Sequence, residues 1–351
     1  MKHVYRIIFI FSAISLTVSN VFAQQDAQFS QYMFNSVYYN PGSAGIEGVT
    51  RATIITRKQW LGYSKSDGYN SPGGTSPTSQ SITVNSRLPF LNRRTGAGLG
   101  IVYDSRGPIT SYEIQLSGAY HVKLGNGLLG IGARAGTYAQ SLRTDWYQVV
   151  DVNDPLYQSL VGNNAKQLKL DYTGGLWYQS SRWYAGVSVD HLTRQKFSYG
   201  TGSTDSSITS SLNNHLNVTG GYTFTLSPTI KITPTAIVQT DLKKMTLVLG
   251  PMIDYNSKFW IALNARQSAA KKDIVAGGKN TWSVNDLIAY AGMNLMKNNA
   301  LKVGFAFDFV MSGRQAQAAT SHEIMLSYML PAPGPALRPK VRTPRYRHDE
   351  N

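Results

Sequence analysis

Apolar and polar side chains alternate with a strict period of two near the C-terminus, and this pattern limits what the chain can fold into. Residues 301–310 carry the clearest case. One face would hold Leu301, Val303, Phe305, Phe307 and Phe309, and the other Lys302, Gly304, Ala306 and Asp308. A helix would scatter the three phenylalanines around its axis, whereas a strand places them together. This segment is therefore predicted to be a β-strand with one apolar and one polar face.

Similar segments, each roughly 10 residues long, recur through most of the chain. They are residues 49–60, 78–88, 95–103, 111–123, 128–139, 168–179, 182–191, 214–226, 229–239, 244–255, 258–267, 285–296, 301–310 and 321–330. An even number of such strands is typical of bacterial outer-membrane barrels, and closure satisfies backbone groups that find no water in a bilayer. We predict an all-β fold, a transmembrane outer-membrane β-barrel of about 14 antiparallel strands. The competing fold is a soluble all-β repeat such as a propeller, but no blade-length repeat is visible.

The connections between these segments alternate between long and short. The long ones are residues 61–77, 140–167, 192–213, 268–284 and 312–320, and the short ones are residues 125–127, 180–181, 227–228, 256–257 and 297–299. Outer-membrane barrels have short periplasmic turns and long outer loops, so both ends of the chain are expected in the periplasm. Residues 89–94 and 240–243 fit this alternation less well. An error in the predicted order of loops and turns would therefore arise at these two connections.

The two ends of the chain divide it into further segments. Lys2 and Arg6 precede a short apolar run, and we expect signal-peptide cleavage between Ala23 and Gln24. Residues 24–48 would then form a periplasmic or plug segment before a barrel of residues 49–330, and the sequence does not decide between plug and periplasm. The formal net charge of +15 would suggest nucleic acid in a soluble protein, but export argues for no nucleic acid.

Residues 331–351 form a Pro-rich basic tail that follows the last predicted strand and is expected in the periplasm. Its prolines prevent helix formation and pairing in a sheet. Two interpretations remain open, a solvated extension and a docking peptide for an acidic periplasmic partner or for peptidoglycan.

Candidate chemistry is sparse. Gly125, Gly127 and Gly130 match a dinucleotide-binding GxGxxG pattern, but a strand pattern follows instead of a helix, so we interpret them as a hairpin turn and lumen glycines. The histidines His121, His191, His215 and His322 fall on four separate strands without metal-ligand spacing. His215 with Asn217 is the best catalytic pair, and a structural role for it is favoured. We expect no enzyme activity, no cofactor and no metal site.

Three motifs together resemble the PorP/SprF family of type IX secretion membrane proteins. They are QFSQYMFN at residues 28–35 followed by NPGSAG at 40–45, RKQWLG at 57–62, and SHEIMLSY at 321–328. The motif residues whose role is unproven are Gln31, Asn35, Asn40, Pro41, Arg57, Gln59, Trp60, His322 and Glu323.

The resemblance implies a Bacteroidetes-type outer-membrane protein that supports secretion or surface anchoring of client proteins such as gliding-motility adhesins. It implies as partners outer-membrane lipids, other type IX secretion components and secreted surface proteins, together with a periplasmic lipoprotein or a peptidoglycan-binding protein. The alternative function is an outer-membrane channel for small apolar solutes, like the fatty-acid transporters of similar strand number. An outer-membrane enzyme is a third hypothesis.

Overall fold

The computed structural model describes most of the chain between residues 26 and 331. The described residues are 26–61, 76–89, 93–143, 153, 158, 166–200, 207–241, 244–270, 281–311 and 320–331. Residues 1–25 and 332–351 lie outside them, and so do the expected cleavage between Ala23 and Gln24 and nearly all of the tail. Within the described residues, no helix is both long and apolar enough to cross a membrane.

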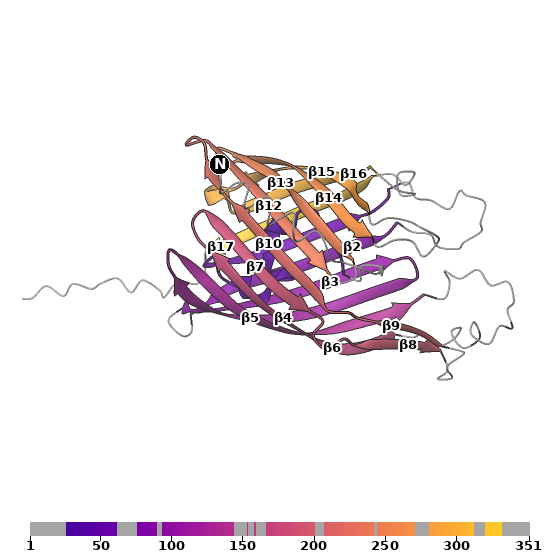
Figure 1. Ribbon diagram of the computed structural model, residues 1–351. Coiled ribbons are helices and arrows are strands. Elements are labelled where there is room, and N and C mark those ends of the chain that lie inside the picture. The colour runs from indigo at the N-terminus through magenta and orange to yellow at the C-terminus, as the bar shows by residue number, and fades with distance from the viewer. Residues whose placement is uncertain are drawn as a thin grey trace, which may run out of the picture.

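The strands form a closed antiparallel barrel (Figure 1). They are β1 (Val49–Lys58), β2 (Thr78–Leu88), β3 (Thr95–Arg106), β4 (Ile109–Leu124), β5 (Gly127–Leu142), β6 (Lys166–Gln179), β7 (Trp183–Asp190), β10 (His215–Tyr222) continued by β11 (Phe224–Thr225), β12 (Ile230–Thr240), β13 (Met245–Tyr255), β14 (Phe259–Ala270), β15 (Thr281–Leu295), β16 (Leu301–Val310) and β17 (Ser321–Pro331). Because β10 and β11 both pair with β12 and are separated by one residue, they count as a single strand. β1 pairs with β17 and closes the ring, so the predicted 14-stranded barrel is confirmed.

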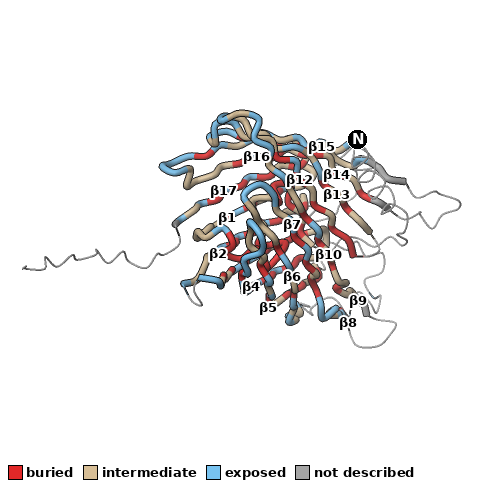
Figure 2. The backbone as a smooth tube through the Cα atoms, turned by 60° about the vertical axis from the view of Figure 1, so that its left-hand side comes forward, coloured by how far each residue is buried: buried red, intermediate tan, exposed pale blue. Residues whose placement is uncertain are grey.

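Side chains alternate between an apolar outer face and a polar lumen. Along β4, Ile114 and Leu116 are 52% and 62% exposed, whereas the intervening Glu113, Gln115 and Ser117 are buried. Buried and exposed residues alternate in the same way along the strands in Figure 2. Exposed apolar side chains around a barrel are stable against lipid and not against water, so this outer face is the membrane-contacting one.

Long connections leave one end of the barrel, here called the loop end, and tight turns close the opposite turn end (Figure 1). The predicted frame holds across both doubtful places, since β2 ends at Leu88, β3 begins at Thr95, and β12 and β13 flank residues 241–244. At the loop end, Gly107 and Pro108 join β3 to β4 directly. The first strand ends earlier than predicted, at Lys58 and not at Trp60, because Trp60 has a positive φ of 53° that no extended strand accommodates.

One hairpin was not predicted. β8 (Lys196–Gly200) and β9 (Ser207–Ser211) pair within the long connection between β7 and β10. Phe197 and Tyr199 of this hairpin are buried against Tyr138 and Leu142 of β5, so it packs against lumen-facing side chains at the loop end. The strand preference of its residues was hidden inside a polar, glycine-containing stretch.

Residues 26–48, here called the lumenal segment, lie inside the barrel. They form η1 (Tyr32–Phe34), α2 (Ser36–Tyr39) and η2 (Pro41–Ser43). The segment supplies most of the aromatic side chains of the largest buried cluster, which also includes Trp260 and Tyr290 from the wall. Most of the described residues of this segment are therefore buried against lumen-facing side chains of the wall.

Candidate functional site

The lumenal segment runs from the loop end of the barrel to the turn end. At its start, Asp26 contacts His191, which follows the loop-end terminus of β7. At its other end, the carbonyl of Gly45 accepts a hydrogen bond from Arg87, near the turn-end terminus of β2. The chain then enters β1. The candidate functional site is therefore the contact between this segment and the barrel wall.

The strongest anchor of the segment lies where the barrel closes. Glu323 of β17 accepts hydrogen bonds from the backbone N–H groups of Ser30 and Gln31, at 2.7 and 2.8 Å. Directly opposite on β1 lies Arg57, whose guanidinium donates to the carbonyl of Gln28 at 2.8 Å. A carboxylate that accepts two N–H groups and a guanidinium that donates to a carbonyl together hold three backbone groups of residues 28–31.

Charged side chains from three neighbouring strands, β14, β15 and β16, surround this anchor. Asp308 Oδ2 lies 2.7 Å from Arg57 and 2.9 Å from Arg266, and Arg266 also pairs with Asp286 at 2.7 Å. Ser30 Oγ donates to Asp308 at 2.8 Å. We call Arg57, Arg266, Asp286, Asp308 and Glu323 the seam cluster. Removing one member of such a buried network leaves an uncompensated charge, so each member matters for the stability of the contact.

In the middle of the lumen, Arg134 of β5 caps the C-terminus of the short helix α2. Its Nη2 donates to the carbonyls of Val37 and Tyr38 at 2.7 and 2.6 Å, which are groups that a helix C-terminus leaves unpaired. Burial raises the pKa of the Tyr38 and Tyr39 phenols, so both stay neutral, and the Tyr38 hydroxyl donates to the carbonyl of Ala27. Asn35 joins the wall through Ser81 and Thr83.

The turn at Asn40 and Gly42 fits into a groove of glycines in the wall. The Asn40 amide donates to backbone carbonyls of β6 and β7 at 2.9 and 3.0 Å. A Cβ on Gly130 would lie 2.0 Å from the Gly42 carbonyl oxygen, and one on Gly132 would lie 2.3 Å from the Gly42 nitrogen. Only residues without a side chain allow this approach. The GxGxxG pattern is thus a hairpin turn followed by lumen glycines, as predicted.

A polar cavity of about 240 Å³ opens at the loop end beside the start of the segment. It is lined by charged groups that include Arg57, Arg106, Lys244, Asp104 and Asp286. Gln59 and Trp60 also line the cavity. The backbone N–H of Gln59 donates a hydrogen bond to the carbonyl of Pro77. This space suits water and small polar groups better than an apolar molecule.

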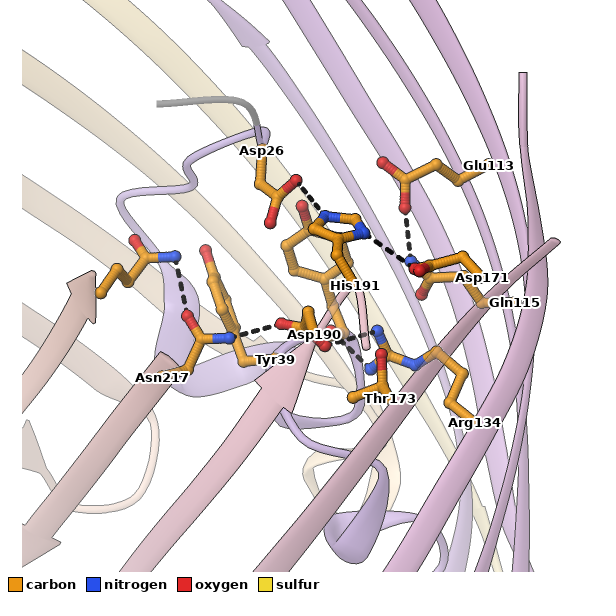
Figure 3. Close-up of a pocket in the computed structure, with 12 residues that line it drawn as sticks. Asp26, Tyr39, Glu113, Gln115, Arg134, Asp171, Thr173, Asp190, His191 and Asn217 are labelled. Atoms are coloured by element: carbon orange, nitrogen blue, oxygen red, sulfur yellow. Dashed lines mark hydrogen bonds and ion pairs between the residues drawn. The ribbon is translucent and has the colours of Figure 1, made fainter. Parts of the chain in front are cut away.

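Two histidines and two carboxylates meet on the opposite wall. His191 lies between Asp26 and Asp171, with Nε2 2.8 Å from Asp26 and Nδ1 2.9 Å from Asp171 (Figure 3). His215 Nδ1 lies 3.3 Å from the other oxygen of Asp26. Burial alone would raise the pKa of Asp26, but the two facing imidazoles lower it below its usual range. Asn217, the suggested catalytic companion of His215, donates to Asp190 instead.

Sequence reasoning found some of these residues and missed others. Of the motif residues, Gln31, Arg57 and Glu323 come together at the seam, and Asn35, Asn40 and Pro41 lie farther along the lumenal segment. His322 does not join them, because it faces outward and its ring packs against Phe305 and Phe307. Sequence reasoning assigned no role to Ser30, Asp308 and Arg266 at the seam or to Asp26 and Asp171 opposite it. It considered His191 and His215 as candidates but did not expect them to meet. The signal available in the sequence was a charged residue on the lumen-facing side of a strand, such as Asp308.

Solved outer-membrane proteins resemble this barrel in arrangement at low sequence identity. The Ralstonia pickettii toluene transporter TbuX is 13% identical, with a TM-score of 0.49 over 86% of this chain and 94% of that one. The Pseudomonas putida toluene transporter TodX is 7% identical, with a TM-score of 0.45 over 90% and 99%. For the Acinetobacter baumannii outer membrane protein Omp33, the identity is 10% and the TM-score 0.39 over 82% and 99%. Such resemblance concerns the fold alone.

No curated protein matches the sequence. The model of one protein family does match, over residues 21–328, and it is described as type IX secretion system membrane protein PorP/SprF. This match covers the lumenal segment and nearly all of the barrel, including every member of the seam cluster. The chain therefore belongs to the PorP/SprF family of type IX secretion system membrane proteins, and it is an outer-membrane β-barrel.

Proposed function

We propose that this protein is a non-enzymatic outer-membrane component of the type IX secretion system that supports secretion or surface anchoring of client proteins such as gliding-motility adhesins. The observation that carries the proposal is the family match over residues 21–328. Its partners would be outer-membrane lipids, other secretion components and the secreted surface proteins themselves.

The lumen favours a supporting role over a conduit. The lumenal segment is fastened at the seam cluster, at Arg134 and at the glycine groove, and the cavity beside it measures about 240 Å³. A folded client domain is far larger than this space. The barrel would then act as an anchor or a docking platform in the membrane, with clients contacting its loop end.

The connections between the strands support one orientation of the barrel. We place the loop end at the cell surface and the turn end in the periplasm, as is usual for outer-membrane barrels. β17 ends at the turn end, so the tail of residues 331–351 would begin in the periplasm and be available to a periplasmic lipoprotein or a peptidoglycan-binding partner. Asp26, in contrast, lies at the loop end. The expectation that both ends of the chain face the periplasm stays a prediction.

A deletion strain tests the proposal. Its surface and culture-medium proteomes should lack specific client proteins that the wild type displays, and complementation should restore them. Unchanged proteomes in both fractions would contradict the proposal. In the same strain, truncation after Leu330 tests the tail: pull-downs at low salt should lose periplasmic partners. Binding of these partners by the full-length protein should itself weaken at high salt, because exposed charges are screened over about 8 Å at physiological ionic strength.

The alternative, a channel for small apolar solutes, makes a different demand on the lumen. Such a channel needs an apolar path, whereas the cavity described above is lined by arginine, lysine and aspartate side chains. Uptake of an aromatic hydrocarbon by proteoliposomes that contain the purified protein would support the channel. Uptake equal to that of empty liposomes would leave the secretion role.

A further inference from the structure

Three side chains with metal-binding atoms converge where the lumenal segment begins. One carboxylate oxygen of Asp26 and one ring nitrogen each of His191 and His215 all lie within 4.8 Å of one another. Three separate elements supply them: the start of the lumenal segment, the residue that follows β7, and the first residue of β10. The β7–β10 pairing sets His215 opposite Asp190, next to His191, although the two histidines are far apart in sequence.

The ring nitrogens of His215 point to a ligand. Both rings are almost fully buried, at 3% exposed. Neither ring nitrogen of His215 makes a hydrogen bond within the described part of the chain, although its Nδ1 lies 3.3 Å from Asp26. Burying an imidazole without hydrogen bonds costs free energy. A metal ion bound to one ring nitrogen would give that nitrogen a partner.

His191 has the support that metal-binding histidines usually have. Its Nδ1 lies 2.9 Å from the Asp171 carboxylate, which would accept the Nδ1 proton and leave Nε2 free to bind an ion. Such a carboxylate–histidine pair orients the ring and raises the basicity of the ligating nitrogen. Figure 3 shows His191 between Asp26 and Asp171, with a dashed line to each. Asp171 is therefore a positioning residue for His191.

The spacing suits a tetrahedral ion. Zinc binds histidine nitrogen and carboxylate oxygen at about 2.0–2.2 Å, which sets neighbouring ligand atoms roughly 3.4 Å apart. The Asp26 oxygens lie 2.8 Å from His191 and 3.3 Å from His215, so small side-chain movements would open the site. Two histidines with one carboxylate leave a fourth position, and Asp26 also borders the polar cavity from which water can fill it.

We propose that Asp26, His191 and His215 bind a divalent transition-metal ion, with Zn²⁺ the best fit, and that the ion fastens the start of the lumenal segment to β7 and β10. The seam cluster holds residues 28–31 on one wall, and the metal would hold Asp26 on the opposite wall. Each ligand comes from a different element, so loss of the ion would free the segment's beginning without disturbing the strands.

Metal titration of the purified protein tests this proposal. The full mature chain, prepared in detergent without a polyhistidine tag and stripped with a chelator, is titrated with Co²⁺ by visible absorption and with Zn²⁺ by competition. The wild type should bind one ion per chain with the spectrum of tetrahedral Co²⁺. His215→Ala and Asp26→Asn should weaken binding by at least ~100-fold, and Asp171→Asn by about 10–100-fold.

A matched control and a second readout keep the result interpretable. His322→Ala removes a histidine from the outer face and should bind Zn²⁺ like the wild type. In an Ala27→Cys variant, whose chain has no other cysteine, Zn²⁺ should slow labelling by a bulky maleimide at least ~10-fold. No Zn²⁺ uptake by the folded wild type, or equal affinity in folded His215→Ala, would overturn the proposal and leave an ordinary histidine–aspartate ion pair. Folding of each variant is checked by its gel shift on boiling.

Discussion

Replacing Glu323 with Gln should release the lumenal segment while leaving the barrel intact. The two carboxylate oxygens accept the N–H groups of Ser30 and Gln31 at 2.7 and 2.8 Å. Glutamine has the same shape but only one acceptor oxygen, so its NH₂ group must face one of these N–H donors. Loss of a buried hydrogen bond to a charged group costs about 1.5–3 kcal/mol, and the remaining bond weakens because its acceptor is neutral.

We therefore expect the anchor to lose about 3 kcal/mol, which corresponds to a roughly 100-fold larger population of released segments. Ala27 lies next to the anchor, is 3% exposed, and belongs to a chain without cysteine. In an Ala27→Cys background, labelling by a polyethylene glycol maleimide too bulky for the 240 Å³ cavity reports release as a gel shift. The labelling rate should rise about 100-fold with Glu323→Gln.

Glu47→Gln is the matched control. It makes the same chemical change within the same segment, but Glu47 pairs with Arg51 and is 39% exposed, so the pair contributes at most about 1 kcal/mol. Its labelling rate should stay within about fivefold of the parent. If Glu323→Gln labels no faster than Glu47→Gln in barrels that remain folded, Glu323 does not hold the segment.

Three further substitutions test other parts of the fold. Phe305→Arg places a charge on the lipid face, where Phe305 is 46% exposed, and should cost about 2–4 kcal/mol in a urea-folding assay; Met311→Arg, beyond the end of β16, should cost less than half of that. Gly130→Ala should destabilise the protein by about 1–3 kcal/mol, because its Cβ would lie 2.0 Å from the backbone of the lumenal segment, whereas Gly118→Ala, with nothing within 4 Å, should change the unfolding midpoint little. Asn40→Ala removes two hydrogen bonds to the wall and should raise protease cleavage of the lumenal segment, consistent with a loss of about 1–3 kcal/mol; an unchanged cleavage pattern would show that the glycine groove alone holds the turn.

The strands were predictable because their signal is local. A period of two needs only neighbouring residues, and the bilayer makes the contrast between faces large. The prediction for β16 is confirmed in detail: Phe305 and Phe309 face outward, and Ala306 and Asp308 are buried in the lumen. What the period did not show is how tightly Ala306 is packed. It is fully buried in the aromatic cluster, so a larger side chain at this position would clash with its neighbours.

The lumenal segment could not be predicted from pattern because its partners are distant and polar. Ser30 and Glu323 are 293 residues apart, and the hydrogen bond between them depends on the curvature of the whole barrel. The same holds for His191 and His215, which lie on different strands and meet only through the β7–β10 register. Spacing rules for metal ligands apply within one helix or loop and do not reach across a sheet. Even so, three motif residues, Gln31, Arg57 and Glu323, meet at one place.

The anchor of the lumenal segment lies at the strand pairing that closes the barrel. Arg57 and Glu323 are direct partners in the pairing of β1 with β17, the last pairing that closes the ring. Before closure, these two side chains are at opposite ends of an open sheet, and neither can hold residues 28–31 as part of the seam cluster. The lumenal segment therefore gains its anchor only when the barrel closes. Closure in turn gains from the segment, because Ser30 bonded to Asp308 and to Glu323 links β16 to β17 beside the seam. Barrel closure and plug insertion are thus expected to be one cooperative step, since each completes hydrogen bonds that the other needs.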